Sequence, residues 1–198
     1  VIGELCQILI PKGKGVVWAE VVAVRSEAVQ MMPYEDMTGI EVGCVVIAMG
    51  EMLSVPVSER LLGRVLDSMG RPIDTKGNVG SRQWSSIFRD PPHVLNRKKI
   101  ENRIVTGIRT IDFLTPVGKG QRLGIFSGSG VGKSTLLGMI ARNTSADVNV
   151  IALIGERGRE VREFIENDLG EKGLKRSIIV VSSSNSPPLS RIRGAFVA

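Results

Sequence analysis

A glycine-rich stretch between two apolar segments constrains the fold of this chain more than any other feature. It reads SGSGVGKST over residues 127–135, with RLGIFS before it and KSTLLGMIARN running on from it. The first segment has the apolar character of a buried strand, and the second repeats apolar residues at helical spacing. Glycines between a strand and a helix let successive backbone N–H groups point inward, toward an anion. The sequence therefore predicts a strand over 122–127, a helix over 133–143 and a phosphate-binding loop between them.

The other residues of this loop indicate a nucleotide with bound Mg²⁺. Lys133 would supply a mobile cation to the terminal phosphates, and the Ser134 hydroxyl would complete the coordination shell of Mg²⁺. The loop follows the pattern G-x-x-x-x-G-K-[ST] except that Ser127 takes the first glycine position, where the backbone N–H is retained. The predicted cofactors are ATP and Mg²⁺, with Ser134 as the metal ligand. The predicted nucleotide-binding residues are Gly128, Ser129, Gly130, Val131, Gly132, Lys133, Ser134 and Thr135.

Strands and helices are predicted to alternate through the rest of the C-terminal part. The apolar runs 148–155 and 177–184 have the composition of buried strands, and the segment 159–170 between them has a helical stripe that ends at Gly170. Strand, helix and strand at this spacing predict a parallel sheet covered by helices, with ligands beyond the carboxyl ends of the strands. We expect the strand over 177–184 to end the sheet and expose its edge.

The stretch IGERGREV, residues 154–161, contributes a candidate catalytic carboxylate. Glu156 follows the strand predicted over 148–155, where it could polarise a water molecule for attack on the terminal phosphate. Arg157 could orient Glu156 or contact phosphate oxygens. Alternatively, Glu156 only favours the start of the next helix and the arginines are solvated, and the residue types alone leave both possibilities open. The predicted catalytic residues are Glu156, Lys133 and Arg157.

The first 52 residues have a different pattern. Val-rich runs such as GVVWAEVVAV and GCVVIAMG alternate with turn-like sequences, which predicts a small β-barrel. We therefore expect two domains, a β-barrel over 1–52 and an α/β nucleotide-binding domain over 53–198. At the start of the second domain, VPVSERLLGRVLDSMGRPID predicts a short helix closed by a turn. The polar segment 75–96, interrupted by Gly and Pro, predicts a connecting loop.

Charge and composition narrow the possible partners. The net charge of +6 raises nucleic acid as a partner, because clustered basic residues attract phosphates. The basic residues come in short groups among acids, however, and aromatic residues that could stack on bases make up only 4% of the chain. We expect no specific nucleic acid partner. With no apolar stretch of membrane-spanning length and no signal-peptide pattern, we expect a cytoplasmic protein.

Several stretches together resemble the flagellar and type III secretion export ATPases, which are related to the catalytic subunit of rotary ATP synthases. The resemblance covers nearly the whole chain and is loosest in the barrel region. It implies an N-terminal β-barrel followed by a RecA-like core, in ring hexamers that bind ATP between subunits. It also implies that Lys133 and Ser134 hold phosphate and Mg²⁺, that Glu156 is the catalytic glutamate and that Arg157 is its neighbour. The stretches that carry it are LLGRVLDSMGRPID, TGIRTIDFLTPVGKGQRLGIFSGSGVGKSTLLGMIA, VIALIGERGREVREFIE and SPPLSRIRGAFVA.

The resemblance further implies partners and an incomplete core. The partners would be identical subunits in a homohexamer, export chaperones, export substrates and export-gate or stalk proteins, at the inner face of the cytoplasmic membrane. The family continues past RIRGA into an acidic Mg²⁺-organising strand and an arginine finger, so we expect this chain alone to hydrolyse ATP negligibly. Three alternatives stay open: a rotary ATP synthase head subunit, a ring-shaped RNA translocase and a nucleotide-binding module without catalysis. Flagellar and virulence-type secretion are not distinguished by these residues.

Overall fold

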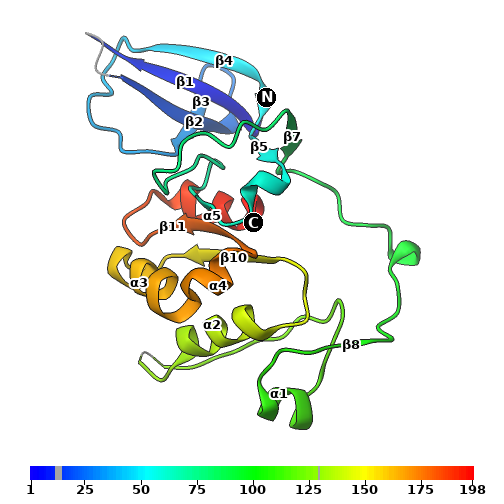
Figure 1. Cartoon of the computed structure of the whole chain (residues 1–198). Helices are drawn as coiled ribbons and strands as arrows, with labels where there is room; N and C mark the ends of the chain where they lie inside the picture. The colour runs from blue at the N-terminus through cyan, green and yellow to red at the C-terminus, as the bar shows by residue number, and fades with distance from the viewer. Residues whose placement is uncertain (12–14, 129) are drawn as a thin grey trace.

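The computed structural model describes residues 1–11, 15–128 and 130–198, and Figure 1 shows a β-sheet region above a region of helices and strands. The upper region is a four-stranded antiparallel sheet in the order β3-β2-β1-β4. Alternate side chains of β1 and β2, among them Ile8, Val17 and Ala19, form its buried face. The sequence prediction of an all-β N-terminal region is therefore confirmed. The strands are β1 (Glu4–Ile10), β2 (Gly15–Val24), β3 (Val29–Pro33) and β4 (Val45–Met52).

A three-stranded parallel sheet forms the centre of the second region. Its order is β10-β11-β6, where β10 is Asn149–Ile154, β11 is Ser177–Ser182 and β6 is Val65–Leu66. The first two strands confirm the strands predicted over 148–155 and 177–184. The prediction that the second of these ends the sheet is wrong, because β6 pairs with its far side: Ile179 lies opposite Val65, and Val180 opposite Leu66.

The prediction of a short helix within residues 55–74 is also wrong, because the only helical turn there is a 3₁₀ turn, Glu59–Leu61. Gly63 has φ +78°, which ends helical geometry at that residue, and its N–H donates to the Ser177 carbonyl at 2.8 Å. The chain is thereby drawn onto the sheet as β6. The predicted loop 75–96 is likewise interrupted, since β7 (Gln83–Ser86) pairs antiparallel with β5 (Ser54–Val57).

Helices cover one face of this sheet, as Figure 1 shows. α2 confirms the helix predicted over 133–143, but the helix predicted over 159–170 is divided and does not end at Gly170. It runs through a π-helical segment, η4, and resumes in α4 after Gly170, whose φ of +62° separates the two. No helix in the described ranges is long and apolar enough to cross a bilayer. The elements are α2 (Lys133–Asn143), α3 (Gly158–Glu163), η4 (Phe164–Leu169) and α4 (Gly170–Leu174).

One more helix, α5 (Pro188–Val197), lies on the other side of the sheet and reaches the N-terminal region. Its Leu189 is buried in one cluster with Leu5 and Tyr34. Its Arg193 forms an ion pair with Glu20 of β2, and Glu20 also accepts a hydrogen bond of 2.6 Å from the Tyr34 hydroxyl. The two regions are thus joined by packing and by a buried polar cluster.

The chain between the regions forms an arm, defined here as residues 87–123, which extends away from the sheet in Figure 1. It contains the 3₁₀ turn η3 (Val94–Asn96), β8 (Arg103–Ile104), α1 (Arg109–Leu114) and β9 (Val117–Gly118). The strand predicted over 122–127 is wrong: residues 121–128 form no strand, and Phe126 is 96% exposed. A strand requires a hydrogen-bonded neighbour, and this segment pairs with none of β6, β10 and β11.

Candidate nucleotide-binding site

The glycine-rich loop leads directly into α2. Gly130 and Gly132 have φ values of +76° and +95°, a conformation that favours glycine, and the Gly132 carbonyl accepts the first helical hydrogen bond from Leu136 at 2.9 Å. Apart from its neighbours in the chain, no described residue has an atom within 4 Å of where a Cβ at Gly128, Gly130 or Gly132 would lie. The loop therefore borders open space, so its backbone is accessible to a ligand. Ser129, also predicted to bind nucleotide, lies outside the described residues.

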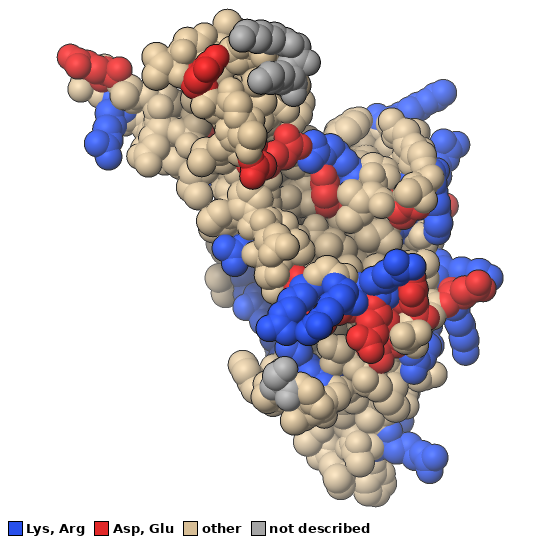
Figure 2. Space-filling model, turned by 90° about the vertical axis from the view of Figure 1, so that its left-hand side faces the viewer, with Lys and Arg blue, Asp and Glu red and all other residues tan. Residues whose placement is uncertain are grey.

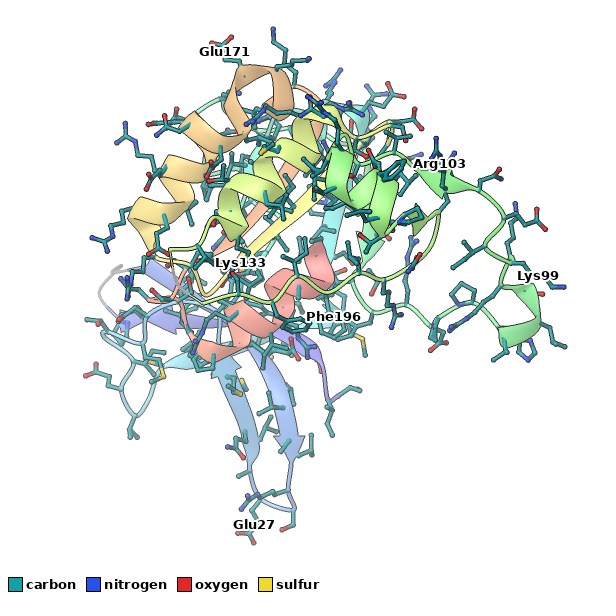
Figure 3. The ribbon with its side chains drawn as sticks, turned by 90° about the horizontal axis from the view of Figure 1, so that it is seen from below. Glu27, Lys99, Arg103, Lys133, Glu171 and Phe196 are labelled. Atoms are coloured by element: carbon teal, nitrogen blue, oxygen red, sulfur yellow. The ribbon has the colours of Figure 1, made fainter. Side chains whose placement is uncertain are left out.

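The start of α2 is suited to an anion. Within the described ranges no side chain caps this eleven-residue helix, so its first N–H groups are available and the helix dipole places positive charge there. Lys133 is the first residue of the helix, and Figure 3 shows it at that end of α2. Lys133, Ser134 and Thr135 are all exposed. An ammonium, a hydroxyl and free backbone donors thus lie together.

A cavity of about 210 Å³ brings this helix start together with the GERGRE stretch. Its size is below the roughly 300–1,000 Å³ of sites that enclose whole small molecules, which suits the phosphate end of a nucleotide. Of the predicted residues, Lys133, Ser134 and Glu156 line it. The lining residues are Ile125, Lys133, Ser134, Leu137, Leu153, Glu156, Glu160, Val161 and Phe164.

Backbone hydrogen bonds fix Glu156 at the carboxyl ends of two strands. The Gly155 N–H donates to the Ser182 carbonyl at 2.7 Å, and the Ser184 N–H donates to the Glu156 carbonyl at 2.9 Å. The Glu156 side chain is half-buried. The N-cap of α3 is Arg157, and no described side chain makes a capping hydrogen bond there. This geometry favours a place for Glu156 in the cavity over a role at the helix start.

Glu160 is a cavity residue that the sequence reasoning missed. The sequence carries no clear signal for it, because Glu156 precedes the N-cap of α3 and helical spacing therefore does not relate the two carboxylates. The Arg157 side chain is 68% exposed and lies outside the lining, but its Nη1 is 3.3 Å from the Glu160 Oε1. The other predicted residues that do not line the cavity are Gly128, Gly130, Val131, Gly132 and Thr135.

The residues present fit a phosphate group with a divalent cation. Lysine and backbone N–H groups bind phosphate oxygens, while serine hydroxyl and carboxylate oxygens are ligands that Mg²⁺ accepts directly or through water. A divalent cation held in this cavity would offset the repulsion between the carboxylates and the phosphates. On the surface, Figure 2 shows basic side chains gathered beside acidic ones on the face that carries α3.

Comparison with known proteins agrees with this arrangement. The model of the β-barrel domain of the ATP synthase alpha/beta family matches residues 1–50, and the model of its nucleotide-binding domain matches residues 107–198. Together these matches cover more than two thirds of the chain. The fold class predicted from the sequence, a β-barrel domain followed by an incomplete RecA-like α/β core, is confirmed.

Individual relatives match over the whole chain. The flagellum-specific ATP synthase of Treponema pallidum (strain Nichols) is 54% identical over 198 residues, which are 100% of this chain and 44% of that protein. The type 3 secretion system ATPase of Xanthomonas euvesicatoria is 45% identical over 99% of this chain and 44% of its own length. The chain thus spans less than half the length of these relatives.

A solved structure of a related ATPase also matches this chain over its whole length. The assembled ATPase EscN in complex with its central stalk EscO, from the type III secretion system of enteropathogenic E. coli, superposes with a TM-score of 0.88 at 40% identity. The match covers 100% of this chain and 48% of that chain. The chain therefore belongs to the ATP synthase alpha/beta family and is similar, over its whole length, to the flagellar and type III secretion ATPases of that family.

Proposed function

We propose that this protein binds ATP with Mg²⁺ and hydrolyses it to energise protein export through a flagellar or type III secretion apparatus. The convergence of Lys133, Ser134 and Glu156 in one cavity at the uncapped start of α2 carries this proposal. The names of the relatives favour export over a rotary synthase head subunit or an RNA translocase, because both flagellar and type 3 secretion ATPases match the whole chain.

Each residue has a role in the proposed reaction. Lys133 and the N–H groups at the start of α2 bind the terminal phosphates and orient them. Glu156 accepts a proton from a water molecule as the water oxygen bonds to the γ-phosphorus and the bond from that phosphorus to the bridging oxygen breaks, releasing ADP. Ser134 would hold Mg²⁺, whose charge would offset that of the phosphates. Glu160 orients Arg157 through their ion pair.

The proposed partners follow from the relatives. The EscN structures are of an assembled ATPase and of its complex with a central stalk, which supports an oligomer with a stalk partner for this protein, and we propose that the oligomer is a homohexamer. We extend the proposal to export chaperones, export substrates and export-gate proteins, and to a position at the inner face of the cytoplasmic membrane.

The proposal is tested with Glu156→Gln, which keeps the shape of the side chain but cannot act as a base. We expect ATP affinity to be retained and phosphate release to fall by about 100-fold or more, the usual contribution of a positioned base. The assay uses a chain of the length of the relatives, since residues 1–198 are expected to turn over ATP negligibly. Glu163→Gln, an exposed residue of α3 outside the cavity, is the matched control. Unchanged turnover in Glu156→Gln would remove the glutamate from the mechanism.

A further inference from the structure

The arm carries nearly all of the net charge of the chain. Residues 87–123 contain eight Lys or Arg and three Asp or Glu, a net charge of +5, while the whole chain has +6. No ion pair among the described residues involves one of these eight basic side chains. One of the three acids is already engaged, because the Asp112 carboxylate accepts hydrogen bonds from the N–H groups of Thr106 and Gly107 at 2.8 and 2.9 Å. The arm is therefore an unneutralised basic surface.

Part of this basic surface is concave. The returning chain brings Lys119 back to the outgoing chain, where its N–H donates to the Asn102 carbonyl at 2.8 Å. The result is a depression of about 510 Å³ that combines ammonium groups with one amide and one carboxylate. Figure 3 shows Lys99 on the outer part of the arm, away from the helices that cover the sheet. The residues that line the depression are Lys98, Lys99, Glu101, Asn102 and Lys119.

The main chain beside the depression is open to pairing. Residues 97–101 belong to no helix or strand, and the N–H groups of 98–101 donate to no acceptor among the described residues. Apolar side chains nearby are also exposed, with Leu95 at 86% and Ile100 at 54%. Unpaired backbone outside any helix or strand, basic side chains and exposed aliphatic side chains thus occur on the same short segment.

We propose that the arm binds an extended acidic segment of a partner protein. The partner's backbone would lie beside residues 98–101 and supply the missing hydrogen bonds, as in β-strand addition. Its carboxylates would pair with Lys98, Lys99 and Lys119, and its aliphatic side chains would cover Ile100. Glu101 would accept an N–H of the partner's backbone. This binding is separate from the proposed ATPase, since none of these residues lines the nucleotide cavity.

The composition of the surface favours a polypeptide over other anions. A phosphate backbone offers only acceptors, so the Glu101 carboxylate in the lining would repel it, and the exposed apolar side chains beside the depression are aliphatic rather than aromatic platforms for bases. Insertion of an amphipathic helix into a membrane surface is not available to this segment, which holds only the three-residue turn Val94–Asn96. A peptide presents donors, acceptors and aliphatic groups together.

The test is fluorescence anisotropy with a labelled peptide of alternating Glu and Val, titrated with the protein at low and at high salt. We expect wild type to bind this peptide, with affinity that falls as salt rises. In Lys98→Glu/Lys99→Glu the affinity should fall by about tenfold or more, because like charges then face each other. The same variant should gain affinity for a peptide of alternating Lys and Val. The matched control is Lys172→Glu/Lys175→Glu, at exposed residues in α4 and at its C-cap, which changes the net charge equally and should bind as wild type does.

Two results would overturn the proposal. An equal loss of affinity for the Glu/Val peptide in the arm variant and in the α4 control would show that binding depends only on the net charge of the protein. Tighter binding of single-stranded RNA or of vesicles containing anionic phospholipid, lost in the arm variant alone, would assign the arm to a polyanion or a membrane instead of a peptide. Circular dichroism spectra of both variants that match wild type establish that the protein is folded.

Discussion

Replacing Arg193 by alanine should destabilise the protein more than any exposed ion pair could. Glu20 is 2% exposed, and its carboxylate accepts hydrogen bonds from both the Tyr34 hydroxyl and the Arg193 guanidinium, one of the latter at 2.9 Å from Nε. Without Arg193 a buried negative charge loses its cation and keeps only the tyrosine. Breaking a buried pair in this way costs about 3–5 kcal/mol of unfolding free energy. The guanidinium also lies 4.6 Å from the centre of the Phe88 ring, a further contact that would be lost.

Two variants separate the charge effect from lost packing. In Tyr34→Phe the carboxylate keeps its ion pair, so we expect a smaller loss of about 1 kcal/mol. In Glu20→Met/Arg193→Met both charges are replaced by apolar side chains, and we expect this pair to be more stable than Arg193→Ala. The coupling between the two sites follows from the double-mutant cycle with Glu20→Met and Arg193→Met as the single variants.

The assay is equilibrium urea unfolding at neutral pH, followed by tryptophan fluorescence and by circular dichroism. The two tryptophans, Trp18 on β2 and Trp84 on β7, report on the N-terminal sheet and on the β5–β7 pair, whereas circular dichroism also reports on the helices around the parallel sheet. Because Arg193 joins the two regions, its replacement should lower the urea midpoint measured by fluorescence and the midpoint measured by circular dichroism. A change below about 1 kcal/mol, typical of a solvated surface pair, would refute the view that this cluster stabilises the junction.

Further predictions concern helix packing and pH. Gly138→Ala should lower the free energy of unfolding by about 1–3 kcal/mol although alanine favours helices, because the new Cβ would lie 2.5 Å from the Asp168 carbonyl oxygen. Gly158→Ala, where no described atom beyond its own helix and chain neighbours lies within 4 Å of the new Cβ, should change this free energy little. Equal urea midpoints for the two variants would contradict the prediction. Burial alone would raise the pKa of Asp74, but hydrogen bonds from Arg64, Val65 and Lys76 lower that pKa to about 2. Asp74 therefore contributes stability above its ordinary pKa that is lost as the pH falls toward 2. Wild type should lose about 2 kcal/mol more than Asp74→Asn on acidification from pH 5 to pH 2, and parallel stability curves would disprove this.

The elements that could be predicted from the sequence are those whose signal is local. α2, β10 and β11 have strong apolar periodicity within ten or so residues and short connections, so their type follows from the sequence alone. The loop chemistry is local too, which is why Lys133 and Ser134, which both line the cavity, could be chosen as candidate site residues from the sequence. Glu156 lies in the same cavity, two residues after the carboxyl end of β10, where ligands of parallel sheets bind.

The errors occur where distant partners decide the outcome. Val65 and Leu66 have helical spacing with their neighbours, but they pair with a strand more than a hundred residues later, and that pairing overrides the local preference. Conversely, residues 122–127 read as a strand but have no neighbour to pair with. The basic depression on the arm could not be predicted from the sequence either, because Lys119 lies near Lys98 only where the chain turns back.

The central claim is that Lys133 at the start of α2 holds the terminal phosphates of a nucleotide. Its most direct test is equilibrium titration of a fluorescent ATP analogue, with Mg²⁺, onto wild type and Lys133→Ala, with Lys172→Ala on α4 as the control. Loss of a hydrogen bond between charged groups should weaken binding by about 10-fold to 100-fold in Lys133→Ala and leave the control unchanged. Binding of equal strength in Lys133→Ala and wild type would contradict the assignment of this cavity to nucleotide phosphates.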